Sequence, residues 1–229
     1  GNSEAGISVS GSQRTLIGTN ADGIADAIEA NVVVGSAQAG LQTTYTGAQF
    51  NVVAGNLIGV NPAGTFAMPN QGGGVALGNA AINNTIGGTT SAERNIISGN
   101  TGNGIGIVRF FNSTTLLPSP DNTIVGNFIG TDITGTAALG NTGNGIYLEE
   151  LNTTIGGNSA NTRNLISANS GSGIVITGSD ATGNILEDNL IGTNASGLAS
   201  LPGQSSGVDI VDTLVLVNGV IEAADAITV

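Results

Sequence analysis

Several residue types are missing from this sequence, and their absence excludes whole classes of functional site. There is no cysteine and no histidine, so disulfide bridges, thiolate metal sites and the Ser-His or Cys-His nucleophile systems are excluded. There is also no lysine, and the net charge is −12. The basic side chains are Arg14, Arg94, Arg109 and Arg163. We therefore expect neither a nucleic-acid-binding surface nor attraction to an anionic membrane.

Charged residues make up only 9% of the chain and aromatic residues 3%. No run of about 18 apolar residues is present, so no membrane insertion is expected. Glycine is abundant, with 38 residues, and 39% of the chain is apolar, which together favour many short strands and tight turns. No signal peptide is visible. Both ends of the chain resemble its repeats, so we expect residues 1–229 to be a single domain, a processed form or segment of a longer protein.

Three short elements recur along the chain in a fixed cyclic order. The first is Gly-Ile-x-Ile or a close variant, whose two apolar residues share one face of a strand. It occurs at Ile7/Val9, Leu41/Thr43, Val75/Leu77, Ile105/Ile107, Ile146/Leu148, Ile174/Ile176, Val208/Ile210 and Ile227/Val229. A less regular element follows it at Ile17, Val53, Ile86, Ile124, Ile155 and Leu186. Each recurrence predicts one strand of a repeated coil.

The remaining element is an asparagine that stands two residues before an isoleucine or valine. It occurs at Asn31, Asn56, Asn95, Asn127, Asn164, Asn189 and Asn218. Because this offset never changes, we expect the asparagines to occupy one corner of successive coils. Each amide would then bond the backbone and the asparagine of the next coil, as in stacked β structures. The alternative is that they are ordinary turn residues.

Two kinds of coil alternate along the chain. In one kind a loop follows the less regular element, as between Ile86 and Asn95. In the other kind a loop follows the asparagine element and spans 17 positions each time, from Ile58 to Val75, from Ile129 to Ile146 and from Ile191 to Val208. Equal spans with changing sequence indicate that the fold sets the loop geometry.

Strands with a single inward pair cannot bury a face alone. Stacking coil on coil at about 4.8 Å would form three parallel sheets around one apolar core. The sequence therefore predicts an all-β protein, a right-handed parallel β-helix (solenoid) of about eight coils with three short strands each.

This pattern resembles the right-handed parallel β-helix repeats of the pectin-lyase-like superfamily, in particular the Asn/Gly-rich repeats of large bacterial secreted and surface proteins. The segments that carry the resemblance are Asn84-Thr-Ile-Gly-Gly, Arg94-Asn-Ile-Ile-Ser-Gly-Asn100, Gly126-Asn-Phe-Ile-Gly-Thr131 and Asn144-Gly-Ile-Tyr-Leu148. It covers essentially the whole chain. The superfamily holds lyases, hydrolases, epimerases, tailspikes, adhesins and scaffolds, so the resemblance implies a fold rather than one activity.

The resemblance implies an Arg or Lys base, often with calcium, for a polysaccharide lyase. Arg94 and Arg163 occupy equivalent positions of the repeat, which favours a structural role, whereas Arg109 stands alone beside an unusual loop. A hydrolase of this fold would need clustered aspartates. The candidate acids are Glu149-Glu150, Glu187-Asp188, Asp209 and Asp212, and neighbours in a strand point to opposite faces. We therefore predict no catalytic residue and no enzyme activity.

One segment matches most of a twelve-position calcium loop. Its ligands would be Asn20, Asp22, the backbone carbonyl of Ile24, Asp26 and Glu29. Gly18 stands where the first ligand should be, which departs from the motif. The alternative is an irregular or helical loop insertion with solvated acids. Calcium is thus the one cofactor that the sequence suggests, and none is required.

A second irregular segment lengthens one coil and carries four bulky apolar residues, Phe110, Phe111, Leu116 and Leu117. If they were exposed, these residues would mark a partner-binding site. The alternative is that the segment folds back over the flank of the solenoid.

Three functions remain open, all extracellular or at the cell surface. The first is a non-catalytic structural rod, either part of a large surface protein or a subunit that stacks end to end into a filament. Its partners would be further copies or neighbouring domains of a longer chain. The second is a carbohydrate-binding or adhesion module presenting the three equal loops, with polysaccharide as its partner. The third is a polysaccharide lyase or hydrolase.

Overall fold

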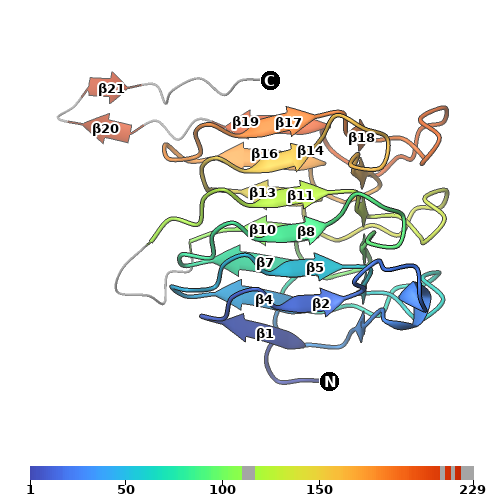
Figure 1. Cartoon of the computed structure of the whole chain (residues 1–229). Helices are drawn as coiled ribbons and strands as arrows, with labels where there is room; N and C mark the ends of the chain where they lie inside the picture. The colour runs from blue at the N-terminus through green and yellow to red at the C-terminus, as the bar shows by residue number, and fades with distance from the viewer. Residues whose placement is uncertain (110–116, 212–214, 218–219, 223–229) are drawn as a thin grey trace.

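The computed structural model describes residues 1–109, 117–211, 215–217 and 220–222 and is a parallel β-solenoid (Figure 1). Three sheets run along its axis, and every strand of these sheets pairs in parallel with the equivalent strand of the next coil. The described part of the chain contains no helix with the length and apolar character needed to cross a membrane.

The three sheets correspond to the three sequence elements. The first sheet contains β1 (Ile7–Ser10), β4 (Leu41–Thr44), β7 (Val75–Gly78), β10 (Ile105–Ile107), β13 (Ile146–Leu148), β16 (Ile174–Thr177) and β19 (Val208–Val211). The second contains β2 (Leu16–Gly18), β5 (Val52–Ala54), β8 (Thr85–Gly87), β11 (Thr123–Val125), β14 (Thr154–Gly156) and β17 (Ile185–Glu187). The third contains β3 (Val32–Val33), β6 (Leu57–Ile58), β9 (Ile96–Ile97), β12 (Phe128–Ile129), β15 (Leu165–Ile166) and β18 (Leu190–Ile191). A 3₁₀ helix, Asp26–Ile28, lies in the loop between β2 and β3.

The prediction of a parallel β-helix is confirmed, but the predicted number of about eight coils was too high. The described residues form six coils of three strands, followed by β19 as the first strand of a seventh. The excess arose at the C-terminal end. There β20 (Val215–Val217) and β21 (Val220–Glu222) pair antiparallel with each other instead of adding to the stack. Strands so close in sequence can pair as a hairpin, whereas parallel pairing needs a long connection. The expected pair Ile227/Val229 lies outside the described residues.

The core is a column of inward side chains that runs through all the coils. Ile58, Ile97, Ile129 and Ile166 belong to it and are fully buried, one on each of four successive strands of the third sheet. Full burial of such a side chain contributes about 1.5–3 kcal/mol relative to exposure. Isoleucine is β-branched and packs well on a pleated surface. In this sheet the constant Asn-x-Ile spacing therefore determines both the strand positions and the core residues.

The predicted asparagine ladder is confirmed for every described member. The side-chain amide of each asparagine donates to Oδ1 of the next, through Asn31, Asn56, Asn95, Asn127, Asn164 and Asn189, at 2.8–3.1 Å. The same amides also donate to backbone carbonyls, for example from Asn56 to Ile17 O at 2.8 Å. These bonds satisfy polar groups that lie inside a buried corner. Asn218 lies outside the described residues.

Two further ladders run through the other corners, and the sequence analysis did not predict them. One joins Asn70, Asn100, Asn141 and Asn169 through amide-to-Oδ1 bonds of 2.9–3.0 Å. The other joins Asn51, Asn84 and Asn122 at 3.0–3.1 Å. It is interrupted at Thr153, whose backbone N–H donates to Asn184 Oδ1 at 2.8 Å. All three corners of the coil are thus held by buried amides.

Candidate functional site

The outer face of the third sheet carries a second row of apolar side chains. In each two-residue strand the second residue points into the core, so the first points outward. The outward residues Leu57, Ile96, Phe128, Leu165 and Leu190 stand in register on successive strands. The first four of them are buried in a cluster of their own. Phe128 therefore faces outward, within a continuous apolar row that the loops cover.

Two sets of loops flank this row. On one side, loops connect β2 to β3, β8 to β9 and β14 to β15. On the other side, the three 17-position loops connect β6 to β7, β12 to β13 and β18 to β19. The latter come from every second coil and still contact one another. The backbone N–H of Ile133 donates to Gly64 O at 3.0 Å, and that of Ala195 donates to Gly135 O at 2.8 Å. This row of bonds, the loop ladder, keeps one wall continuous.

A polar side chain organises the start of each 17-position loop. Asn61 Oδ1 accepts the backbone N–H of Phe66 at 2.9 Å, and Asp132 Oδ1 accepts those of Thr136 and Ala137 at 3.0 and 3.1 Å. Partial burial acts to raise the pKa of the Asp132 carboxyl, but the hydrogen bonds from Ala137, Thr134 and Thr136 outweigh it and lower that pKa. The carboxylate is therefore the form that the loop stabilises.

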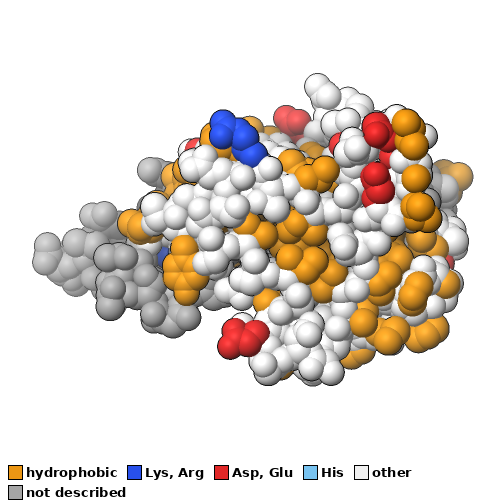
Figure 2. Space-filling view, turned by 60° about the horizontal axis from the view of Figure 1, so that its bottom comes forward, with side chains coloured by type: hydrophobic (Ala, Val, Ile, Leu, Met, Phe, Trp, Pro, Cys, Tyr) orange, Lys and Arg blue, Asp and Glu red, His pale blue; other side chains and the backbone are white. Residues whose placement is uncertain are grey.

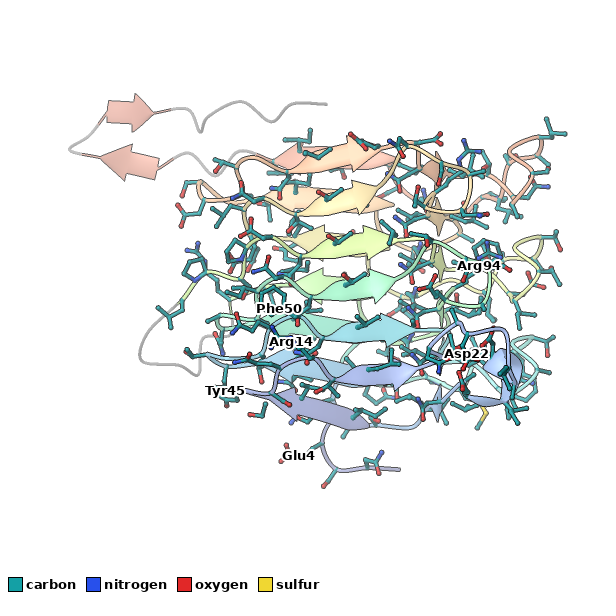
Figure 3. The ribbon with its side chains drawn as sticks, in the orientation of Figure 1. Glu4, Arg14, Asp22, Tyr45, Phe50 and Arg94 are labelled. Carbon is teal, nitrogen blue, oxygen red and sulfur yellow. The ribbon has the colours of Figure 1, made fainter. Side chains whose placement is uncertain are left out.

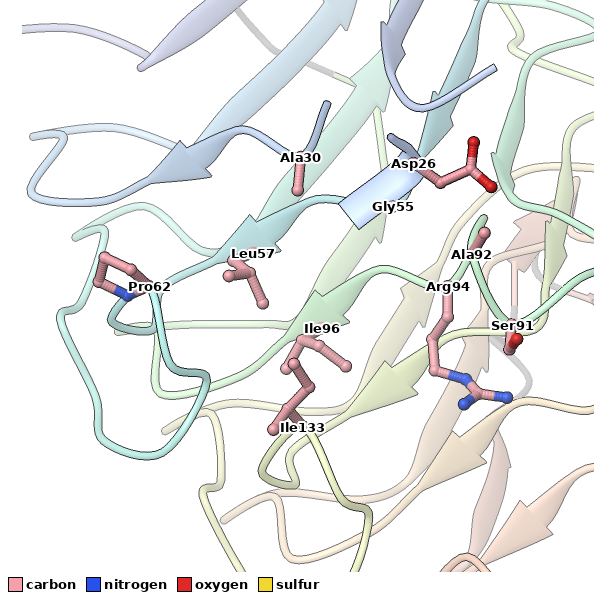
Figure 4. Close-up of a pocket in the computed structure, with 10 residues that line it drawn as sticks. All are labelled: Asp26, Ala30, Gly55, Leu57, Pro62, Ser91, Ala92, Arg94, Ile96 and Ile133. Atoms are coloured by element: carbon pink, nitrogen blue, oxygen red, sulfur yellow. The ribbon is translucent and has the colours of Figure 1, made fainter. Parts of the chain in front are cut away.

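Between the two sets of loops lie two hollows, which together we call the axial groove. The first, of about 370 Å³, is lined by Asp26, Ala30, Gly55, Leu57, Pro62, Ser91, Ala92, Arg94, Ile96 and Ile133 (Figure 4). The second, of about 310 Å³, is lined by Arg94, Phe128, Ile133, Thr134, Ala160, Arg163, Leu165, Leu190 and Ala195. Because Arg94 and Ile133 line both hollows, the two adjoin along the solenoid axis.

Arg94 lies where the two hollows meet. Its guanidinium carbon stands 4.1 Å from the centre of the Phe128 ring, a cation–π contact, and its Nε donates to Gly126 O at 3.3 Å. Partial burial lowers the pKa of this guanidinium from its ordinary value. Arg163 makes the equivalent backbone bond, from Nε to Asp188 O at 3.2 Å. Both arginines thus tie a loop to the next coil, which agrees with the structural role expected for a repeated residue.

The proposed calcium loop is held by its own backbone in this structure. The carboxylate of Glu29 accepts the N–H of Asn20 at 3.1 Å, and that of Asp22 accepts the N–H of Ile24 at 2.8 Å. Asp26 Oδ1 accepts from Gly23 N–H at 3.3 Å and begins the 3₁₀ helix. Within the described residues, no group of three or more His, Cys, Asp or Glu side chains is placed to hold a metal. The geometry favours the irregular-loop alternative, and a calcium titration distinguishes it from a metal site.

A second polar cluster joins three coils at the end of the first sheet, and it brings together residues that the sequence analysis considered separately. Arg109 pairs with the fully buried Glu150 at 3.3 Å and with Asp180 at 2.7 Å. The backbone N–H of Arg109 donates to Glu149, which also accepts from Tyr147 Oη at 3.0 Å. Burial raises the pKa of Glu150, while the Ser119 backbone and Arg109 oppose that shift. With no exposed surface, Glu150 has no access to a substrate.

The adjacent insertion was a candidate partner site. Phe110, Phe111 and Leu116 lie outside the described residues. Leu117 is exposed over 42% of its surface. The partner prediction for this segment therefore remains a prediction.

The other candidate acids are dispersed and make ordinary contacts. Asp188 pairs with Arg163, whose Nη2 lies 2.7 Å from Oδ1. Asp209 accepts a hydrogen bond from the Ser172 hydroxyl. Asp212 lies outside the described residues. None of these acids lines the axial groove, where the carboxylate lining is Asp26.

We compared the chain with protein-family models, with curated proteins and with solved structures. None of the three comparisons finds a match. The parallel solenoid is therefore shown by its strand pairing, whereas the resemblance to the pectin-lyase-like superfamily and to bacterial surface proteins rests on the repeat pattern.

Proposed function

We propose that this chain is a non-catalytic structural protein of the cell exterior, a rigid β-helical rod that further coils extend at its ends. The observation that carries the proposal is the asparagine ladder, which runs unbroken from Asn31 in the first coil to Asn189 in the sixth and is buried from Asn56 to Asn164. A ladder of this kind joins each coil to the next with side-chain and backbone bonds, so the coils resist shear and separation. Most of the distinctive polar residues thereby serve stacking rather than a surface site.

The two ends of the stack support the same proposal. At the C-terminal end, Val208 and Ile210 of β19 occupy core positions of the first sheet but are 38% and 47% exposed. At the N-terminal end the inward residues Val9, Ile17 and Val33 are only 6%, 7% and 6% exposed, but β1, β2 and β3 are edge strands with no partner on that side among the described residues. Figure 2 is turned towards that end and shows apolar side chains among uncharged polar ones, with few charged side chains. Apolar surface and unpaired strand edges of this kind are usually covered by another coil.

Sedimentation velocity and negative-stain electron microscopy over a range of concentrations test the extension of the rod. If the filament is the natural form, the chain should associate end to end, and Ile210→Asp should reduce that association because it places a charge on the exposed end of the core. Gln42→Asp is the matched control, since it adds the same charge to the first sheet away from that end. A wild-type chain that stays monomeric at all concentrations would exclude the filament form. Turnover of a polysaccharide in a lyase or hydrolase assay would overturn the non-catalytic assignment.

Adhesion is a second candidate, favoured by the surface of the three stacked loops. Phe66 is 56% exposed and Leu198 is 90% exposed, in a chain with few aromatic residues. An exposed aromatic ring can serve as a platform for a sugar ring. A glycan array tests this function, with Phe66→Ala as the variant that should lose any signal. An array on which the wild-type chain binds nothing would exclude a glycan ligand among those displayed.

A further inference from the structure

The two groove arginines occupy equivalent places in the repeat but have different partners. Each precedes a ladder asparagine and donates its Nε to a backbone carbonyl one coil away. For Arg163 that carbonyl belongs to Asp188, whose carboxylate also accepts from Nη2 at 2.7 Å to both oxygens. For Arg94 the equivalent residue is Gly126. The repeat thus gives one arginine its own carboxylate and the other none.

The lack of a side chain opposite Arg94 is built into the backbone. Gly126 has φ +71°, and a Cβ atom there would lie 2.4 Å from Gly88 O. The chain therefore cannot place a carboxylate at that position without rearrangement. In the part of the chain that the structure describes, no acidic side chain lies within ion-pair distance of Arg94. Its terminal nitrogens remain donors in a half-buried site, where a charge-assisted hydrogen bond is strong.

Space for a ligand exists beside this guanidinium. In the preceding loop the position equivalent to Arg94 is Ala30, and its short side chain leaves the hollow of about 370 Å³ between them. In the close-up, Arg94 stands with Ser91 and Ala92 on one side, near the apolar side chains of Ile96 and Ile133 (Figure 4). Figure 3 places Arg94 among the loops that flank the third sheet. A volume of this order matches a small-molecule site with mostly apolar walls, in which Arg94 is the cation and Asp26 is the other charged lining residue.

We propose that the first hollow of the axial groove is a binding site for a carboxylate attached to an apolar or ring-shaped group, with Arg94 as its anchor. The carboxylate accepts from the terminal nitrogens of Arg94, in the arrangement that Asp188 shows at Arg163. The Phe128 ring holds the guanidinium plane from one face, so its donor edge is fixed before the ligand arrives. Leu57, Ile96 and Ile133 contact the apolar part. This site does not depend on whether the rod is extended at its ends.

Charge makes the proposal selective. The chain has a net charge of −12, so an anion is repelled at long range, and only a local cation can hold it. Salt at about 0.15 M screens that repulsion beyond roughly 8 Å but weakens a half-buried contact much less. Binding of a carboxylate to so acidic a protein would therefore report on the groove rather than on the surface as a whole.

Titration calorimetry or ligand-observed NMR at neutral pH with about 0.15 M salt tests the site. The probes are benzoate and cyclohexanecarboxylate, with benzamide and cyclohexanecarboxamide as uncharged counterparts. We expect one carboxylate per chain, and binding that is roughly tenfold to 100-fold weaker both for the amides and for Arg94→Gln. Arg163→Gln is the matched control and should leave binding unchanged. Unfolding midpoints of both variants verify that the coils remain intact.

A further variant reverses the difference between the two arginines. Asp188→Gly reproduces at Arg163 the surroundings of Arg94, and a positive φ of +47° at Asp188 already suits glycine. We expect the stoichiometry to rise from one carboxylate to two. Absence of binding to the wild-type chain, equal binding of the amides, or equal binding to Arg94→Gln would each overturn the proposal. An unchanged stoichiometry in Asp188→Gly would overturn the argument that a missing carboxylate creates the site.

Discussion

Replacement of Asn127 by alanine tests how much of the stability resides in the asparagine ladder. The Asn127 amide donates to Ile86 O at 2.9 Å, to Val125 O at 3.0 Å and to Asn164 Oδ1 at 3.1 Å. Its Oδ1 accepts from Asn95 Nδ2 at 2.8 Å. The side chain is fully buried, so water cannot replace these partners after the substitution. Several groups of three different coils would lose a hydrogen bond at once.

The expected cost follows from the partners that remain. Val125 O keeps the N–H of Gly88, and Asn95 Nδ2 keeps Val53 O at 2.7 Å. Because the former partners of Asn127 keep other hydrogen bonds, the loss of each bond should cost near the lower end of the usual range, about 1 kcal/mol of stability. Four hydrogen bonds are lost, so Asn127→Ala should lower the free energy of unfolding by about 4 kcal/mol.

Urea titration followed by circular dichroism measures this cost, with Asn189→Ala as the internal comparison. Asn189 is the last rung in the sixth coil and is only partly buried. Water can therefore form hydrogen bonds with the groups that Asn189→Ala leaves without a partner, and we expect the free energy of unfolding to fall by about 1 kcal/mol. If both variants lost the same amount, burial of the ladder would not determine its contribution, and the reasoning would be wrong.

Three other outcomes can be measured on the same chain. Folding lowers the pKa of Asp132. The contribution of its carboxylate to stability is therefore present above the unfolded-state pKa and is lost as the pH falls through the folded-state pKa. Asp132→Asn should thus flatten the fall in melting temperature between about pH 5 and 2. Gly135→Ala should cost about 2–3 kcal/mol in urea, because φ is +67° and the new Cβ would lie 2.7 Å from the Phe128 ring, whereas Gly23→Ala, with φ +80° and open space, should cost about 1. Calcium titration by calorimetry should give no saturable heat, since the loop acids already accept backbone N–H groups; heat that disappears in Asp26→Asn would establish the metal site.

The fold was predictable because its strongest signals are local and repeated. An Ile-x-Ile pair specifies a strand face, and the constant offset from Asn95 to Ile97 specifies a corner. The second ladder had an equally regular signal, since Asn100 and Asn141 stand five residues before the strands that begin at Ile105 and Ile146. It was missed because these asparagines end loops of different length and so do not share an offset to the preceding strand.

The axial groove could not be predicted from the sequence, for a physical reason. Its floor is formed by the first residue of two-residue strands, where outward and inward side chains are both apolar. The alternation of polar and apolar residues therefore gives no indication that the side chains of Leu57 and Ile96 point away from the core. Its walls are loops from different coils, and their contact is a backbone bond that carries no side-chain signature. In the sequence, the difference between the surroundings of Arg94 and Arg163 appears only as a glycine, Gly126, at the position equivalent to Asp188. That equivalence can be recognised only once the coils are aligned.

The loop ladder has a direction, and this direction bears on how the rod is extended. Ile133 and Ala195 each donate a backbone N–H to the glycine of the preceding 17-position loop. The equivalent residue of the first such loop is Pro62, which has no N–H. The ladder thus begins at Pro62, whereas at its other end the exposed Gly197 carries a carbonyl equivalent to those of the two accepting glycines. A second copy of this chain would bring its own Pro62 towards Gly197 and could not continue the ladder. A following loop with an N–H at that position could continue the ladder, which favours extension by further repeats of a longer chain over stacking of identical copies.

If the filament form is nevertheless the natural one, Pro62→Ala should strengthen association in sedimentation velocity, because it supplies the missing donor. An unchanged sedimentation profile would show that the loops do not meet between copies.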